Sequence, residues 1–254
     1  MIYYNFYFVK DLWYNTRIMD KNEQFPMRIN KYLAHKGLAT RAGVDELIKS
    51  KKVLINGSVA VLGDKVLSKD KVEVRDRHTK KDYVYLAYNK PRGIVTANPQ
   101  GDEQGIEKTF SFQTKVFPVG RLDKESHGLI ILTNDGRITD RLLNPIYDHQ
   151  KEYFVETDKN LSPAFLKHMQ DGVDIGDYKT KKTLIKKMGE RKFSITLTEG
   201  KNRQIRKMTD KLGYNVVDLK RIRIQNIKLE KIPTNSYRKI IGQEKNTFLK
   251  SIGL

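Results

Sequence analysis

Residues 117–136 have the sequence FPVGRLDKESHGLIILTNDG, and the fold is easiest to work out from this stretch. Its apolar run, 128–132, predicts a buried strand. The polar residues that follow this run are good helix N-caps, so a helix is expected over 136–143. Asp123 stands a few residues before the strand, beside a glycine turn. Taken alone, this spacing is common in loops, and an ordinary ion pair between Arg121 and Asp123 is the default interpretation.

The flanking segments alternate between strand and helix patterns. By periodicity and turn signals, the expected strands are 83–88, 151–156 and 193–197, and the expected helices are 162–172 and 203–212. The first of these strands runs into the turn Asn89-Lys90-Pro91-Arg92-Gly93, and 94–117 is expected to be mainly loop. Strands mixed with a few helices indicate an α+β domain with a mainly antiparallel mixed sheet and flanking helices.

The chain before residue 75 has a pattern of its own. Ile29 and Leu33 have helical spacing with a stop at Gly37, and Thr40 is expected to cap a second helix. A short strand with Val53 and Ile55 is expected before the Asn56-Gly57 turn, and Val72 and Val74 are expected to form the last strand. An RNA-binding surface and a solvated charged face are both consistent with the basic residues between the apolar positions, which are Arg28, Lys31, Arg41, Lys49, Lys51 and Lys52.

These patterns divide the chain into successive parts. The expected division is an N-terminal extension (1–26), a small domain (27–75), a linker (76–82), a large catalytic domain (83–240) and a C-terminal tail (241–254). The aromatic first segment is a poor signal peptide, because polar residues interrupt it and no small-residue cleavage site follows. It is interpreted as an accessory or a misassigned extension, and Met19 and Met27 are candidate starts of translation.

Composition favours a polyanionic partner. The formal net charge is +19 and the pI is about 9.8, a field that attracts nucleic acid through phosphate contacts and counterion release. The alternative is a lysine-rich protein of an AT-rich genome. The absence of cysteine excludes disulfides, thiolate metal sites and cysteine nucleophiles. The five histidines lack metal-site spacing, and no apolar run is long enough for a membrane span.

Three segments in order resemble bacterial pseudouridine synthases of the RsuA/RluB/RluE/RluF family. They are FPVGRLDKESHGLIILTNDG, KEYFVETDK and TEGKNRQIRKMTDKLGY. The resemblance spans about residues 27–240, and residues 124–130 and 178–182 are most similar to the RluF branch, which modifies 23S ribosomal RNA. It implies isomerisation of a specific uridine to pseudouridine without a metal or other cofactor.

The small domain resembles the S4 RNA-binding domain. The matching segments are Arg28-Ile29-Asn30-Lys31, Thr40-Arg41 and Val53-Leu54-Ile55-Asn56-Gly57. The sequence departs from the usual pattern at Asn30, where aspartate is common, and at Ala42-Gly43, where a second basic residue often stands. This resemblance implies an RNA-binding role for Arg28, Lys31, Arg41, Lys51 and Lys52.

The resemblance also implies roles for single residues of the large domain. Asp123 is the catalytic carboxylate, Tyr153 stacks on the target base and is a candidate for removing its C5 proton, and Arg206 pairs with Asp123. By pattern alone, Tyr153 is a core tyrosine. Arg121 matches the side chain that fills the gap left by an extruded uridine. Arg203 and Lys207 are expected to grip phosphate, with a solvated helix face as the alternative.

The expected partner is ribosomal RNA, with 23S favoured, or an assembling ribosomal subunit, and the protein is expected to be a cytoplasmic monomer. Two alternatives remain open. The same chemistry on 16S RNA or another RNA site would differ only in the target. A non-catalytic S4-containing assembly factor would lack Asp123, Tyr153 or Arg206, and all three are present.

Overall fold

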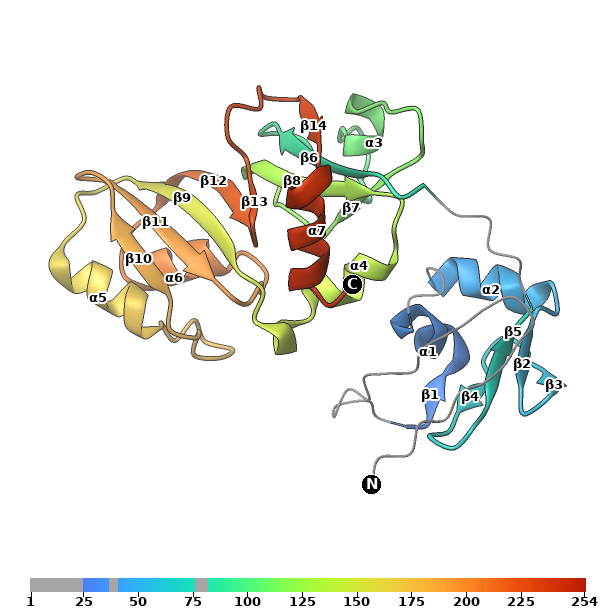
Figure 1. The fold of residues 1–254 in the computed structure, drawn as a ribbon. Helices are drawn as coiled ribbons and strands as arrows, with labels where there is room; N and C mark the ends of the chain where they lie inside the picture. The colour runs from blue at the N-terminus through green and yellow to red at the C-terminus, as the bar shows by residue number, and fades with distance from the viewer. Residues whose placement is uncertain (1–24, 37–40, 76–81) are drawn as a thin grey trace. The chain divides into compact units, whose positions relative to one another are not determined.

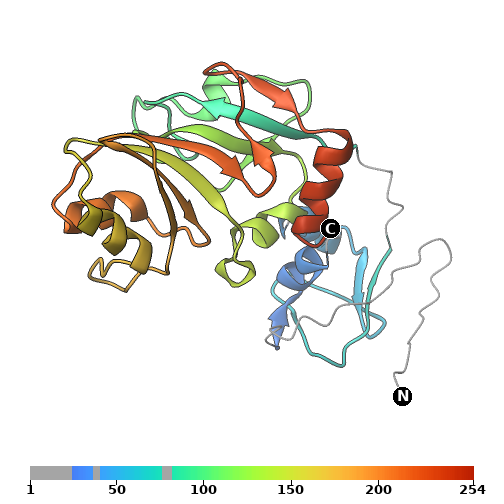
Figure 2. The ribbon, with the colours of Figure 1, turned by 60° about the vertical axis from the view of Figure 1, so that its left-hand side comes forward.

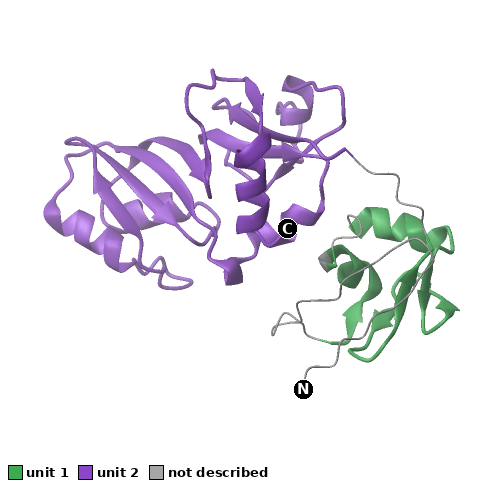
Figure 3. Cartoon of the chain, viewed as in Figure 1, with its two compact units in different colours: residues 1–36, 41–77 green, residues 37–40, 78–254 purple. Residues whose placement is uncertain are grey.

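The computed structural model describes residues 25–36, 41–75 and 82–254. These residues form two compact units, coloured green and purple in Figure 3. Most of the predicted N-terminal extension and of the predicted linker lies outside the described residues, as does the predicted helix cap at Thr40. Each unit is described by itself.

The first unit packs two helices on short strands. Its helices are α1 (Ile29–His35) and α2 (Arg41–Lys49), and its strands are β1 (Met27–Arg28), β2 (Val53–Ile55), β3 (Ser58–Val59), β4 (Lys65–Val66) and β5 (Val72–Val74). The strands pair as β3-β2-β5 and as β1-β4. The side chains of Leu33, Val44, Ile48 and Val53 are buried between these elements. The helical spacing of the sequence therefore produces the expected core.

The second unit is built on one large sheet (Figure 1). Within the described residues this sheet has nine strands, with the main order β10-β11-β9-β12-β8-β6-β14, and β13 and β7 pair with β12 and β8. The strands are β6 (Tyr85–Lys90), β7 (Phe117–Val119), β8 (His127–Thr133), β9 (Lys151–Thr157), β10 (Leu184–Lys187), β11 (Lys192–Leu197), β12 (Val216–Ile224), β13 (Ile227–Lys228) and β14 (Tyr237–Lys239). The expected α+β fold with a mainly antiparallel sheet is confirmed.

Helices cover the two halves of this sheet separately (Figure 2). They are α3 (Ile106–Thr109), α4 (Arg137–Leu143), the 3-10 helix η1 (Pro145–Tyr147), α5 (Pro163–Asp171), α6 (Gln204–Lys211) and α7 (Gly242–Ser251). One core joins β6 and β8 to α4 and α7, and a second core joins β9 and β11 to α5 and α6. A third cluster lies between β6, β8 and α3. The sheet therefore carries a separate core on each half.

The two halves meet where β12 runs beside β8. This pairing is parallel and joins Lys220 to His127 and Arg221 to Gly128, whereas the other pairings of the described sheet are antiparallel. Gly128 has a φ of +101°, and a Cβ there would lie 2.4 Å from the carbonyl oxygen of Arg221. Only glycine permits this approach of the two strands.

Two parts of the chain differ from the sequence-based expectation. Residues 241–254, predicted to be a tail, contain α7, whose Phe248 is completely buried in the β6/β8 core. The apolar side chains Phe248, Leu249 and Ile252 pack against this core, and they attach the helix to the sheet. The predicted loop 94–117 contains the short helix α3. Among the helices that the structure describes, none is both long and apolar enough to cross a membrane.

Candidate functional site

The loop that carries Asp123 is held by hydrogen bonds to its backbone. Thr96 Oγ1 donates to the carbonyl of Leu122 (2.6 Å) and accepts from its N–H (3.0 Å). The N–H of Gly93 donates to the carbonyl of Lys124 (2.8 Å). Inside the loop, the N–H of Ser126 donates to the carbonyl of Asp123 (3.0 Å). The backbone on both sides of Asp123 is therefore fixed, while its side chain is half-buried.

Buried cations lie beneath this loop and donate to it. Lys90 Nζ donates to the carbonyls of Ser126 and Pro91, both at 2.9 Å. Arg221 Nε donates to the carbonyl of Leu129 (2.7 Å), and its Nη1 donates to that of Arg121 (3.5 Å). Lys90 is 0% exposed and Arg221 is 3% exposed, which is rare for such residues unless they are paired. Both side chains act as fixed supports of the loop.

These buried amines have an altered acidity. Burial, together with the nearby Arg221 guanidinium, lowers the pKa of Lys90 to about 8, although the negative charge of Asp123 opposes the shift. Burial and the same guanidinium lower the pKa of Lys151, at the start of β9, to about 8. Asp123 therefore lies close to buried side chains that carry positive charge.

Arg206 lies near Asp123 but is held by another carboxylate. Its Nη1 donates to the carbonyl of Val216 (3.2 Å), and its Nε lies 3.7 Å from Glu125 Oε2. Burial lowers the pKa of Arg206, and the charges of Glu125 and Asp123 act to raise it. Among the described residues, no cation lies within 4.0 Å of the Asp123 carboxylate. The expected contact between Arg206 and Asp123 is thus replaced here by one with Glu125.

The other predicted cations of this region are exposed. Arg203 Nη1 donates to Glu125 Oε2 at 2.8 Å, and Lys207 Nζ lies 3.7 Å from Asp177 Oδ2. The side chain of Arg121 is exposed, and within the described part of the chain no hydrogen bond or ion pair of its guanidinium is found. The side chains of Arg121, Arg203 and Lys207 are therefore at least partly accessible to a ligand.

Tyr153 reaches the same region from the other half of the sheet. It is paired with Arg221 on β12, which in turn is paired with Gly128 on β8. Residues directly opposite on neighbouring strands project from the same face, so Tyr153 shares a face with the guanidinium that supports the Asp123 loop. Its ring packs partly against the core that includes Ile205 of α6. The hydroxyl has no hydrogen-bond partner among the described residues.

The remaining predicted RNA-binding residues lie in the first unit. Arg28, Lys31, Arg41 and Lys51 are exposed, and Lys52 is half-buried. The Asn30 amide donates to Asp45 Oδ1 (2.9 Å), so this departure from the usual S4 pattern ties α1 to α2. These cations belong to the first unit, whereas Asp123 belongs to the second.

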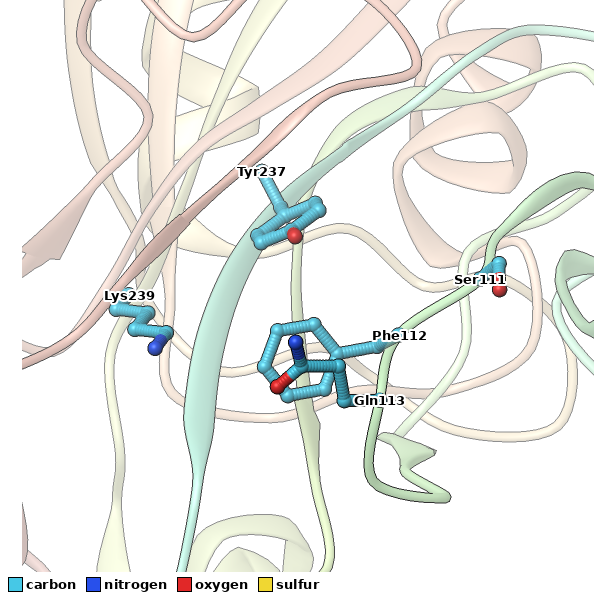
Figure 4. A pocket seen from close by; sticks show the side chains of 5 residues that line it. All are labelled: Ser111, Phe112, Gln113, Tyr237 and Lys239. Carbon is cyan, nitrogen blue, oxygen red and sulfur yellow. The ribbon is translucent and has the colours of Figure 1, made fainter.

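Sequence reasoning missed several residues of the site. Lys90 and Thr96 were placed in a turn and a loop, and Glu125 and Arg221 were given no role. The sequence signal for Lys90 was the Lys-Pro-Arg-Gly turn, and the signal for Arg221 was the charged stretch 218–223. No cluster of metal-binding side chains is found in the described residues. A hollow of about 440 Å³ at the edge strand β14 lies between Phe112, Tyr237 and Lys239 and contains none of the predicted residues (Figure 4).

The family comparisons match both units. The family described as RNA pseudouridylate synthase matches residues 84–211, and the S4 domain matches residues 27–72. The first match takes in β6, the Asp123 loop and the whole of α6. It therefore covers the proposed site, with the exception of Arg221.

Characterised relatives and a solved structure are similar over most of the chain. The dual-specificity RNA pseudouridine synthase RluF of Escherichia coli K12 is 40% identical over 86% of this chain and 77% of its own length. The ribosomal large subunit pseudouridine synthase B of Bacillus subtilis is 32% identical over 85% of this chain and 93% of its own length. A crystal structure of a pseudouridylate synthase superposes with a TM-score of 0.65 at 25% identity, over 89% of this chain and 99% of that one.

Proposed function

The chain belongs to the RNA pseudouridine synthase family, and from this we propose that it isomerises a specific uridine of ribosomal RNA, favouring 23S, with Asp123 as catalytic carboxylate. The observation that carries the assignment of Asp123 is its setting. The loop is fixed by backbone hydrogen bonds, and buried cations lie beneath it. A carboxylate on a fixed loop, with cationic groups beneath it, is held in place for attack.

The reaction breaks one bond and forms another. In one route the Asp123 carboxylate attacks C1′ of the target nucleoside as the N1–C1′ bond breaks and the electron pair leaves with uracil. In the other route Asp123 removes the C2′ proton as the N1–C1′ bond breaks, which gives a glycal. In both routes the uracil then rotates and C5 bonds to C1′. This step displaces the Asp123 carboxylate in the first route, and in the second route Asp123 returns the proton to C2′. Finally the proton on C5 is lost and N1 gains one. An ionised carboxylate suits either route because positive character develops on the sugar.

Tyr153 and Arg206 complete the proposed site. The free hydroxyl of Tyr153 makes it the candidate for accepting the C5 proton, and its ring offers a stacking surface for the uracil. Arg206 is proposed to orient Asp123 when RNA is bound. Arg121, which is exposed beside Asp123, is proposed to fill the gap left by the extruded uridine.

The exposed cations are proposed to hold the rest of the RNA. Arg203 and Lys207 would contact phosphates near the target, and Arg28, Lys31, Arg41, Lys51 and Lys52 of the S4 unit would contact a second part of the RNA. A folded rRNA segment or an assembling ribosomal subunit supplies such an extended surface. We expect the protein to act as a monomer in the cytoplasm, where ribosomes assemble.

The test is pseudouridine mapping of total RNA from cells with and without the gene. We expect at least one 23S site to lose its pseudouridine and to regain it with the wild-type gene. Because the RluF relatives are described as dual-specificity enzymes, all RNA classes should be mapped. A site in 16S or in another RNA would replace the 23S proposal, and unchanged RNA throughout would contradict the proposed function.

A further inference from the structure

Glu125, two residues after Asp123, bridges two cations of α6 and its N-cap. Its Oε2 accepts a hydrogen bond from Arg203 Nη1 at 2.8 Å and lies 3.7 Å from Arg206 Nε. The Glu125 side chain is 58% exposed and that of Arg203 is 42% exposed, whereas that of Arg206 is only 15% exposed. The pairs therefore join an exposed, adaptable carboxylate to a deeply placed guanidinium.

The Arg206 guanidinium is incompletely satisfied in this arrangement. Its Nε is buried, and within the described residues it has no hydrogen-bond partner. At 3.7 Å, the Glu125 oxygen is too distant for a good hydrogen bond. Buried N–H groups of charged side chains normally find an acceptor. An acceptor oxygen that reaches deeper than Glu125 would satisfy this group.

The surrounding charges favour an anion at this position. The positive charge of Arg92 interacts with both Glu125 and Arg206. Arg92 itself donates a hydrogen bond to Asp218, whose Oδ1 also lies 2.8 Å from His127 Nε2. The hydrogen bond from Arg203, with the charges of Arg203, Arg206 and Arg92, lowers the pKa of Glu125. Asp218 is paired with Arg92 and His127. Among the described residues, Glu125 is the carboxylate that lies within 4.0 Å of both Arg203 and Arg206.

Exposed ion pairs contribute little to stability, so the Glu125 carboxylate is easily displaced. A phosphodiester also presents two charge-bearing oxygens, and guanidinium groups bind such oxygens with short, charge-assisted hydrogen bonds. One phosphate between Arg203 and Arg206 would reproduce both contacts of Glu125. It would also leave the carboxylate free to move into solvent.

We propose that Glu125 occupies, in the RNA-free protein, the binding position of an RNA backbone phosphate between Arg203 and Arg206. This inference rests on the proposed function. When RNA arrives, its phosphate displaces Glu125 and bridges Arg203 and Arg206, and the guanidinium N–H groups of Arg206 that the phosphate leaves free can bond to Asp123. The exchange thereby links the position of Arg206, the proposed partner of Asp123, to RNA binding.

The test measures the affinity for a fluorescent 12-nucleotide oligocytidylate by anisotropy over a salt series. This RNA contains no uridine, so its binding is independent of isomerisation. Glu125→Gln removes the competing carboxylate, and we expect about a 5-fold lower Kd and a salt slope steeper by about 1. Asp171→Asn is the control, because it removes one exposed carboxylate from an ion pair with Lys167 on α5. Its Kd is expected to change less than about 2-fold.

A double variant tests whether the higher RNA affinity of Glu125→Gln depends on the phosphate position between Arg203 and Arg206. In Arg203→Ala the phosphate contact is lost, so adding Glu125→Gln to it should give no further increase in affinity. Equal gains in Glu125→Gln and Asp171→Asn, or no gain in Glu125→Gln, would overturn the exchange. Since no step in this assay requires turnover, that result would leave the proposed isomerase function standing. Conversely, an inactive wild-type enzyme with a normal Glu125→Gln gain would contradict the function alone.

Discussion

Two groups of basic side chains in the second unit have opposite settings. Lys90 and Arg221 are buried below the Asp123 loop and donate to backbone carbonyls. Arg203 and Lys207, at the start of α6, are exposed and face the carboxylates of other side chains. A carbonyl held in the backbone cannot leave its cation, whereas an exposed carboxylate can. The same residue types therefore fix geometry in one place and remain available for a ligand in the other.

The largest effect is expected from Asp123→Asn, which removes the carboxylate carried by the fixed loop. The amide keeps the shape of the side chain but cannot act as nucleophile or base, so we expect the rate of pseudouridine formation to fall at least about 10⁴-fold. Single-turnover assays on the mapped RNA measure this, and oligocytidylate binding should be nearly unchanged. Turnover at the wild-type rate would remove Asp123 from the mechanism.

Gly128→Ala tests whether the support beneath the loop depends on the close approach of two strands. The added Cβ would lie 2.4 Å from the carbonyl oxygen of Arg221, at a φ of +101°. We expect the free energy of unfolding of the second unit to fall by about 3 kcal/mol. Urea denaturation checks this. The matched control is Gly176→Ala, where φ is +100° and no atom lies within 4 Å of the added Cβ, and a similar loss there would assign the effect to backbone strain alone.

Arg203→Ala tests the exposed group. Loss of one phosphate contact is expected to weaken RNA binding about 10-fold and to reduce the salt slope by about 1. The melting temperature should barely change, because the Arg203–Glu125 pair is exposed. Lys167→Ala removes a comparable exposed cation, paired with Asp171 on α5. If both variants bind RNA equally, Arg203 has no special role.

The buried group also predicts a pH dependence of stability. The pKa of both Lys90 and Lys151 is lowered to about 8 in the folded protein, from an ordinary value of 10.5. Between these values the unfolded chain binds more protons, so stability should rise with pH by at most about 1.4 kcal/mol per pH unit for each lysine. Below pH 8 both states are protonated, and the slope should vanish.

Urea unfolding at pH 7.5 and 9.5 measures this rise. The range stops there because burial and Asp135 raise the pKa of Tyr85, which gives a slope of the opposite sign at higher pH. Lys90→Met should remove about half of the rise. An identical rise in wild type and Lys90→Met would show that Lys90 has an ordinary pKa in the folded protein.

The contrast between buried and exposed cations also limits what the sequence can reveal. Strands β8, β9 and β11 and helices α5 and α6 were predicted correctly, because their apolar residues follow simple periods. β12 was not predicted, since its stretch Asp218-Leu219-Lys220-Arg221-Ile222-Arg223 has the charge of a surface segment. Its Arg221 is buried only because distant carbonyls accept its hydrogen bonds. Such partners cannot be inferred from local pattern.

The candidate site also contains residues that the sequence indicated and residues that it did not. Asp123, Tyr153 and Arg206 were proposed from a family resemblance, because their local spacing is uninformative. Lys90 was invisible because lysine is almost always exposed. Its burial depends on the carbonyls of Pro91 and Ser126, which come together only in the folded chain.

The narrow parallel pairing of β12 with β8 has a mechanical consequence. Asp123 follows β7 and precedes β8 on one half of the sheet, and Tyr153 and the helix of Arg206 belong to the other half, with its separate core. The two halves are joined by two residue pairs of parallel register. Strand β12 contributes Leu219 to one core and Ile224 to the other. A displacement of one half against the other would therefore have to disturb this strand, so the separation of Asp123 from Tyr153 is set by the packing of β12.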